Sequence, residues 1–249
     1  MRQLTTRDKL ILTGLFLSKF DVNGLQALGF DGFIEAYNVI ALSLNSKPAS
    51  IKNYRDEFDP YWPNPRQGRH NRPIREHCKN IMDEFNNLDI DSFATLLKTE
   101  ISAVGDIEII EENIDPSEYN TFAKRLITGQ AAEKYFEEIY STLSEFQDFN
   151  LINTTRFGCG FDYKMLKDNY PFLAVEVKGM AASTGEVMLT SKEYKTAQIL
   201  ENRFYLFVVR NFTEKPYHTV FQNPAKSKLV FDRRESITVQ ESWTASIQR

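Results

Sequence analysis

Cysteine is scarce in this chain of 249 residues, and long apolar runs are missing from it. The 2 cysteines, Cys78 and Cys159, lie in differently patterned regions, so nothing indicates a disulfide framework or a zinc site. Reduced thiols are typical of a cytoplasmic protein, which is the location we expect. No segment has the length of a membrane span. The short apolar stretch from Leu10 to Leu17 is closely bracketed by charged residues, which predicts a buried helix and not a signal peptide.

The chain also lacks a strong excess of charge of one sign. Its 30 Lys and Arg residues stand against 34 Asp and Glu residues, which gives a net charge of −4. This total does not favour nucleic acid as a partner, but a sum over the whole chain can hide a local basic surface. The composition, 42% hydrophobic and 26% charged, is that of a globular protein long enough for two domains.

Residues 158–178 are the most informative stretch, because they predict a β-hairpin with acidic side chains on one face. Apolar and polar residues alternate before a polar turn around Asn169, and a run rich in β-branched residues follows the turn. If the turn centres on Asn169, Asp162 lies directly across from Glu176, with Cβ atoms about 5 Å apart. Lys178 shares that face, since side chains two residues apart on a strand point the same way.

These residue types suit metal-assisted chemistry. Two close carboxylates repel each other, and a bound cation relieves the repulsion. The carboxylates of Asp162 and Glu176, with the backbone carbonyl of Val177, are ligands that Mg²⁺ accepts. Lys178 beside the metal would help to activate water. An alternative stays open: on an ordinary amphipathic strand Glu176 and Lys178 would be solvated, and Asp162 would pair with a lysine.

The order of the motifs resembles that of a known nuclease superfamily. Asp162, followed on the next strand by Glu176-Val-Lys178, resembles the D…(D/E)-x-K signature of the PD-(D/E)XK nucleases. Over residues 125–225 the motifs resemble a domain of unknown function found at the C-terminus of the NO VEIN protein and in restriction-type proteins. The segments that carry this second resemblance are Gly160–Asp162, Val175–Gly179, Leu189–Tyr194 and Phe204–Asn211. Phe161 replaces the proline that precedes the first aspartate in the superfamily.

The resemblance implies a fold and a set of site residues. The fold would be a mixed β-sheet flanked by helices, with elements in the order α-β-β-β-α-β. Asp162, Glu176 and Lys178 would be catalytic, and Asp162, Glu176 and the Val177 carbonyl would hold Mg²⁺. On the helix expected within residues 119–148, Glu133 matches the acidic residue that completes the metal site in related folds. The alternative for Glu133 is a glutamate on a solvated helix surface.

The segment after the hairpin predicts a helix and then a central strand. Thr190-Ser-Lys-Glu193 predicts a capping box at the start of the helix, and capping alone would account for both residues. Lys192 and Lys195 on this helix would line the substrate groove and neutralise phosphates. The continuous apolar run Phe204–Val209 predicts a strand covered on both faces.

We expect two domains joined by an acidic connection. Residues 1–105 predict a helical DNA-recognition domain compatible with a helix-turn-helix, including a helix with Asp91 as its N-cap. Residues 106–118 are rich in acidic side chains and predict the linker. Residues 119–249 would form the nuclease domain.

Residues 47–79 predict a local basic surface in the helical domain. They contain eight basic and four acidic side chains, with aromatic residues between them and a loop rich in proline in the middle. Such groups can contact phosphates and base edges. The candidate DNA-binding residues are Lys47, Lys52, Tyr54, Arg55, Arg66, Arg69, His70, Asn71, Arg72 and Arg75. The alternative is a solvated loop whose arginines pair with acidic neighbours.

Together these features predict a Mg²⁺-dependent endonuclease that hydrolyses phosphodiesters in double-stranded DNA, with a type II restriction endonuclease as the leading case. A homodimer would place two sites on the two strands of a palindromic sequence. Two alternatives remain: a non-catalytic DNA-binding or defence-complex module of the same fold, and a nuclease acting on modified DNA or RNA.

Overall fold

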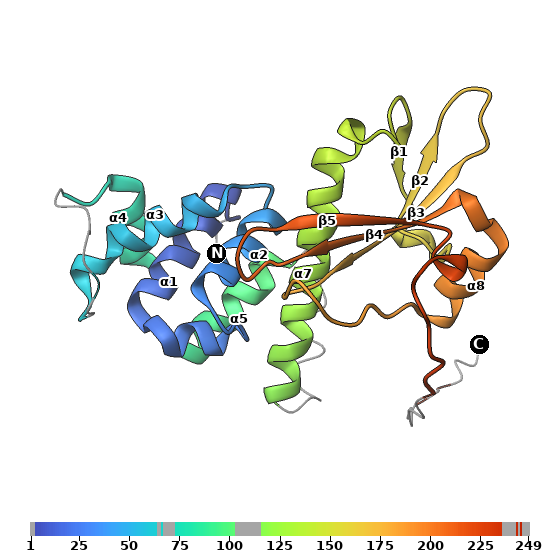
Figure 1. The fold of residues 1–249 in the computed structure, drawn as a ribbon. Helices are drawn as coiled ribbons and strands as arrows, with labels where there is room; N and C mark the ends of the chain where they lie inside the picture. The colour runs from blue at the N-terminus through green and yellow to red at the C-terminus, as the bar shows by residue number, and fades with distance from the viewer. Residues whose placement is uncertain are drawn as a thin grey trace.

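A helical bundle and a five-stranded mixed sheet make up the computed structural model of this chain (Figure 1). It describes residues 3–63, 66, 73–102, 116–235, 243 and 245. The architecture is of the α+β class, and the helical N-terminal region followed by a mixed sheet flanked by helices is as the sequence predicts. No helix in these ranges is both long and apolar enough to cross a membrane.

Five helices in the described part of the chain form the N-terminal bundle. They are α1 (Thr6–Ala27), α2 (Phe33–Ser43), α3 (Pro48–Phe58), α4 (Glu76–Phe85) and α5 (Ile90–Ile101). The apolar stretch Leu10–Leu17 is buried within α1, as predicted. The predicted N-cap of α5 was wrong. The N-cap is Asp89, whose side chain accepts a hydrogen bond from the backbone N–H of Ser92 at 2.9 Å. The predicted cap, Asp91, lies inside the first turn. Its carboxylate interacts favourably with the helix dipole there but is not the N-cap.

The sheet follows the long helix α7 (Pro116–Ile139). Its elements are β1 (Asn150–Asn153), β2 (Tyr163–Leu166), β3 (Leu173–Gly179), α8 (Ser191–Leu200), β4 (Phe204–Arg210) and β5 (Tyr217–Gln222). The strands pair in the order β1-β2-β3-β4-β5, and only β3 and β4 run parallel, joined by the crossover helix α8. The α-β-β-β-α-β order is therefore confirmed, and β4 is the buried central strand that the sequence predicts.

The two faces of β3 pack against different helices. Val175 and Val177 belong to the large core that includes the α7 residues Ala132 and Phe136. Ala174, on the other face, packs with Ala197 of α8. Helix α7 approaches the end of β3 so closely that a Cβ on Gly179 would lie 2.8 Å from a backbone oxygen of α7. Glycine is required there, and the close approach brings α7 near the residues that follow Glu176.

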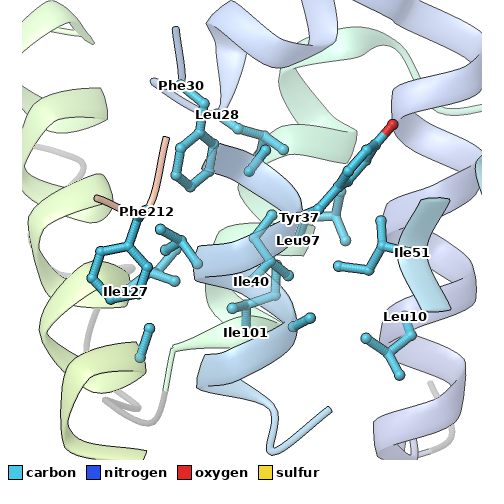
Figure 2. Packing of buried hydrophobic residues seen from close by; sticks show 14 of the residues in the cluster. Leu10, Leu28, Phe30, Tyr37, Ile40, Ile51, Leu97, Ile101, Ile127 and Phe212 are labelled. Atoms are coloured by element: carbon cyan, nitrogen blue, oxygen red, sulfur yellow. The ribbon is translucent and has the colours of Figure 1, made fainter. Parts of the chain in front are cut away.

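One continuous core connects the helical bundle to the sheet. Ile40 of α2, Ile127 of α7 and Phe212 after β4 belong to the same buried cluster (Figure 2). The Asn38 side chain on α2 donates hydrogen bonds to the carbonyl oxygens of Phe212, at 2.7 Å, and Glu214, at 2.8 Å. Residues 106–115 of the predicted linker lie outside the described residues. Its last three residues, 116–118, form the start of α7.

Replacing Asn38 tests this connection. Asn38 is 5% exposed, so Asn38→Ala would leave the buried carbonyl of Phe212 without this donor. We expect the free energy of unfolding to fall by about 2 kcal/mol, the typical cost of an unsatisfied buried polar group. Urea denaturation measures it. Asn53→Ala, at an exposed position of α3, is the control and should change stability by less than about 0.5 kcal/mol. Equal effects of the two changes would contradict the proposed connection.

Candidate active site

The predicted register of the hairpin is confirmed. Tyr163 pairs with Val175 and Met165 with Leu173, which places Asn169 at the centre of the turn. Asn169 has φ 64°, a left-handed conformation that asparagine tolerates better than most residues. The same register, extended by one residue beyond the last pair of the ladder, brings Asp162 opposite Glu176.

Asp162 immediately precedes β2 and lies beside the part of β3 that continues beyond the last β2–β3 pair. Its backbone N–H donates to the Val175 carbonyl at 3.0 Å, and its Oδ2 accepts the Val177 N–H at 2.9 Å. The buried Thr154 fixes the backbone there, since its N–H donates to the Asp162 carbonyl at 2.7 Å and its hydroxyl donates to the same oxygen at 3.0 Å. The carboxylate position is therefore set by backbone contacts on both sides.

Lys178 connects two carboxylates. Its Nζ lies 2.6 Å from Oε1 of Glu176 and 3.0 Å from Oε2 of Glu193 in the first turn of α8. Glu176 is 3% exposed, so the alternative of a solvated strand does not describe it. The predicted capping box is confirmed: Glu193 accepts the Thr190 N–H at 2.9 Å, and Thr190 accepts the Glu193 N–H at 3.3 Å.

Burial and charge shift the pKa values at this site. Burial, with the nearby Asp162, raises the pKa of Glu176 to about 8, although Lys178 opposes the shift. Burial also raises the pKa of Asp162, against the hydrogen bond from Val177. Burial would lower the pKa of Lys178, but Glu176 and Glu193 outweigh it, and the pKa is raised. Lys178 is therefore a cation. The carboxylates of Asp162 and Glu176 would stabilise a further positive charge bound between them.

Glu133 on α7 belongs to the same electrostatic cluster. Burial, together with Asp162 and Glu137, raises the pKa of its carboxyl group to about 7. Glu137, one turn further along α7, accepts a hydrogen bond from the Tyr163 hydroxyl at 2.9 Å. The half-buried setting of Glu133 differs from that of a solvated helix-surface glutamate.

The donor set fits a magnesium ion with few protein ligands. Mg²⁺ is usually bound by one or two carboxylates and keeps several waters. Asp162 and Glu176 supply two carboxylates, and the Val177 carbonyl points to the Asp162 side of β3, because its N–H does. In the described part of the chain no three His, Cys, Asp or Glu side chains form a metal-binding group. The role of Glu133 in completing the metal site stays a prediction.

Three of the predicted DNA-binding arginines are held by carboxylates within the bundle. Arg55 is buried and donates to Asp21 at 2.5 Å and to the Tyr37 hydroxyl at 2.8 Å. The side chain of Arg66 pairs with Asp21 and Asp59, and Arg75 pairs with Glu57. The alternative interpretation, pairing with acidic neighbours, thus describes Arg55, Arg66 and Arg75.

The remaining candidates are separated in space. Lys47 and Lys52 are exposed and Tyr54 is partly buried, all on or beside α3, whereas Lys192 and Lys195 are exposed on α8. Figure 1 places α3 and α8 at opposite ends of the molecule. The structure does not bring these two groups together on one local surface. Arg69, His70, Asn71 and Arg72 lie outside the described residues.

Glu193 is the site residue that sequence reasoning interpreted as a cap alone. A signal for its second contact existed in the pattern. In a strand–helix–strand unit with parallel strands, the helix starts near the carboxyl end of the first strand. Lys178, at the end of β3, and Glu193, in the first turn of α8, are therefore expected to be close.

The raised pKa of Glu133 predicts how stability depends on pH. Its folded-state value of about 7 exceeds the ordinary 4.5, so the unfolded chain loses this proton first. Between these values the carboxyl group makes folding less favourable as pH rises. In EDTA, Glu133→Gln should therefore be more stable than wild type at pH 8, by a margin that shrinks toward pH 5. Urea denaturation at both pH values measures this. Glu138→Gln, exposed on the same helix, should show no such margin.

Comparison with known proteins identifies one family over this region. Residues 132–222 match the family model for the C-terminal region of protein NO VEIN. This range contains Glu133, Asp162, Glu176, Lys178 and Glu193. It confirms the predicted resemblance to the NO VEIN C-terminal domain over just over a third of the chain, whereas the resemblance to the PD-(D/E)XK nucleases stays a prediction. No curated protein and no solved structure matches the chain.

Proposed function

We propose that this protein is a Mg²⁺-dependent endonuclease that hydrolyses phosphodiesters in double-stranded DNA. The observation that supports this most strongly is the placement of Lys178, 2.6 Å from the buried Glu176 and on the strand edge where Asp162 lies. A half-buried lysine between carboxylates, beside a further carboxylate with a raised pKa, is typical of a catalytic centre. The motif order, which resembles that of the PD-(D/E)XK nucleases, adds support from the sequence.

The residues of the chain would divide the chemistry as follows. Asp162, Glu176 and the Val177 carbonyl would hold the metal ion, which when bound polarises the phosphate and makes water more acidic. Lys178, beside this carboxylate pair, would orient the attacking water and stabilise negative charge on the phosphate. Glu133, with its pKa near neutrality, would exchange a proton with solvent near the site.

The finer proposal is a type II restriction endonuclease that acts as a homodimer. One site cleaves one strand, so a two-fold symmetric dimer would cut both strands of a palindromic sequence. Lys192 and Lys195 are exposed on the helix that carries Glu193, where they would contact the DNA phosphates. Lys47 and Lys52 would serve a separate contact surface.

The test is a cleavage assay on mixed duplex DNA with Mg²⁺ and with EDTA. Discrete fragments that appear only with Mg²⁺ would support the proposal, and their ends would give the recognition sequence. Parallel reactions contain methylated duplex DNA and single-stranded RNA. Cleavage of only one of these would assign the alternative substrate. DNA that is retarded on a gel but stays intact in all conditions would contradict the catalytic proposal and indicate a non-catalytic binding module.

A further inference from the structure

Glu193 makes two contacts that belong to different parts of the molecule. Oε2 accepts the Thr190 N–H, which closes the first turn of α8, and the same oxygen lies 3.0 Å from the ammonium group of Lys178. The capping contact fixes the direction of the glutamate side chain. Lys178 therefore has one partner on its own strand, Glu176, and a second partner whose position is set by the start of a helix.

The two partners of Lys178 differ in what a cation would do to them. Glu176 is a proposed ligand of the metal ion, so the ammonium group and the metal would compete for the same carboxylate oxygens. Like charges repel, and a cation bound by Glu176 would move Lys178 away from it. Glu193 is not among the proposed ligands, and its hydrogen bond to Thr190 keeps it in place. It thus offers the lysine a carboxylate that remains available when the metal is bound.

We propose that Glu193 is a positioning residue that holds Lys178 when a divalent cation takes Glu176, so that metal binding and lysine orientation are coupled through the first turn of α8. This inference rests on the proposed function, because it requires a metal at Asp162 and Glu176. It assigns to Glu193 a role that a capping residue alone would not have. Without Glu193, Lys178 would stay on Glu176 and oppose the metal.

The experiment is a titration with Mn²⁺, in which the electron paramagnetic resonance signal reports the free ion. It compares wild type, Glu193→Gln, Lys178→Met and the double variant. Glutamine keeps an oxygen for the Thr190 N–H but loses the charge that pairs with Lys178. We expect Glu193→Gln to weaken Mn²⁺ binding about tenfold when Lys178 is present and by less than about threefold in the Lys178→Met background, since coupling energies between contacting residues have this size. Lys178→Met alone should tighten binding.

Thr190→Ala is the matched control. It removes the threonine half of the capping box but leaves the contact between Glu193 and Lys178. Its melting temperature should fall while its affinity for Mn²⁺ stays that of wild type. If Glu193 only caps the helix, Glu193→Gln should lower the melting temperature as Thr190→Ala does and should leave the Mn²⁺ affinity equally unchanged.

The outcomes separate this inference from the proposed function. An equal loss of affinity on Glu193→Gln in both backgrounds would show that the glutamate acts through its charge alone and would overturn the inference. Unchanged affinity in both would do the same. A wild type that binds no Mn²⁺, or that binds it no better than Asp162→Asn, would remove the proposed metal site itself and with it the inference.

Discussion

Asp162→Asn is expected to reduce Mg²⁺-dependent DNA hydrolysis by about a thousandfold or more, because the metal's stabilisation of the transition state is worth several kcal/mol. Asparagine keeps an oxygen that can accept the Val177 N–H, so the strand edge should be preserved. The change removes only the negative charge and with it the main attraction for the cation. Single-turnover cleavage of a labelled duplex containing the recognition site measures the rate.

The hairpin offers a matched control for this change. Asp168 is exposed in the turn on the same hairpin, so Asp168→Asn removes the same charge away from the site. It should retain the wild-type rate. Lys178→Met should also be inactive, but it should still bind the metal, which distinguishes loss of the water-orienting group from loss of the ligand. If Asp162→Asn cleaves DNA at close to the wild-type rate, the assignment of Asp162 to the metal site is wrong.

Phe212→Ala is expected to lower the free energy of unfolding by about 3–5 kcal/mol, the range for removing a buried aromatic side chain. Phe212 is 0% exposed and belongs to the cluster that joins α2 and α7 (Figure 2). The lost ring would leave a cavity between two helices from different parts of the chain. Urea denaturation followed by circular dichroism measures the loss.

A second phenylalanine provides the comparison. Phe157, in a short turn before Asp162, is 76% exposed, so Phe157→Ala deletes the same atoms from a solvated position. Its effect on stability should be within about 0.5 kcal/mol of zero. If the two variants unfold at the same urea concentration, the bundle and the sheet do not depend on each other through Phe212.

The site could be predicted where it depends on local patterns. The register of the hairpin follows from alternation and from the turn at Asn169, and both are readable within some fifteen residues. Asp162, Glu176 and Lys178 were placed together for that reason. The contact between Lys178 and Glu193 depends on the crossover of α8, which the sequence predicts only as an element order. Such a contact requires the packed sheet.

The basic segment shows a different limit. Composition counts the charges of residues 47–79 but does not tell which arginines have partners. Arg55 pairs with Asp21, 34 positions earlier in the chain, at a kink where Asp21 has φ 48°. The two residues meet only when α1 and α3 pack together. The N-cap of α5 was missed for a simpler reason, since Asp89 and Asp91 are both acceptable caps two residues apart.

The continuous core limits how this part of the chain could be exchanged between proteins. The segment that matches the NO VEIN C-terminal family model begins at residue 132, in the middle of α7, and ends at residue 222 with β5. The segment includes Phe212. It excludes Asn38, which donates a hydrogen bond to the Phe212 carbonyl, and Ile127, which belongs to the same buried cluster as Phe212. Exchange of this segment alone would divide α7 and separate Phe212 from the α2 residues and Ile127 in its buried cluster. A segment with these bounds therefore needs helical residues outside it to complete the core around Phe212.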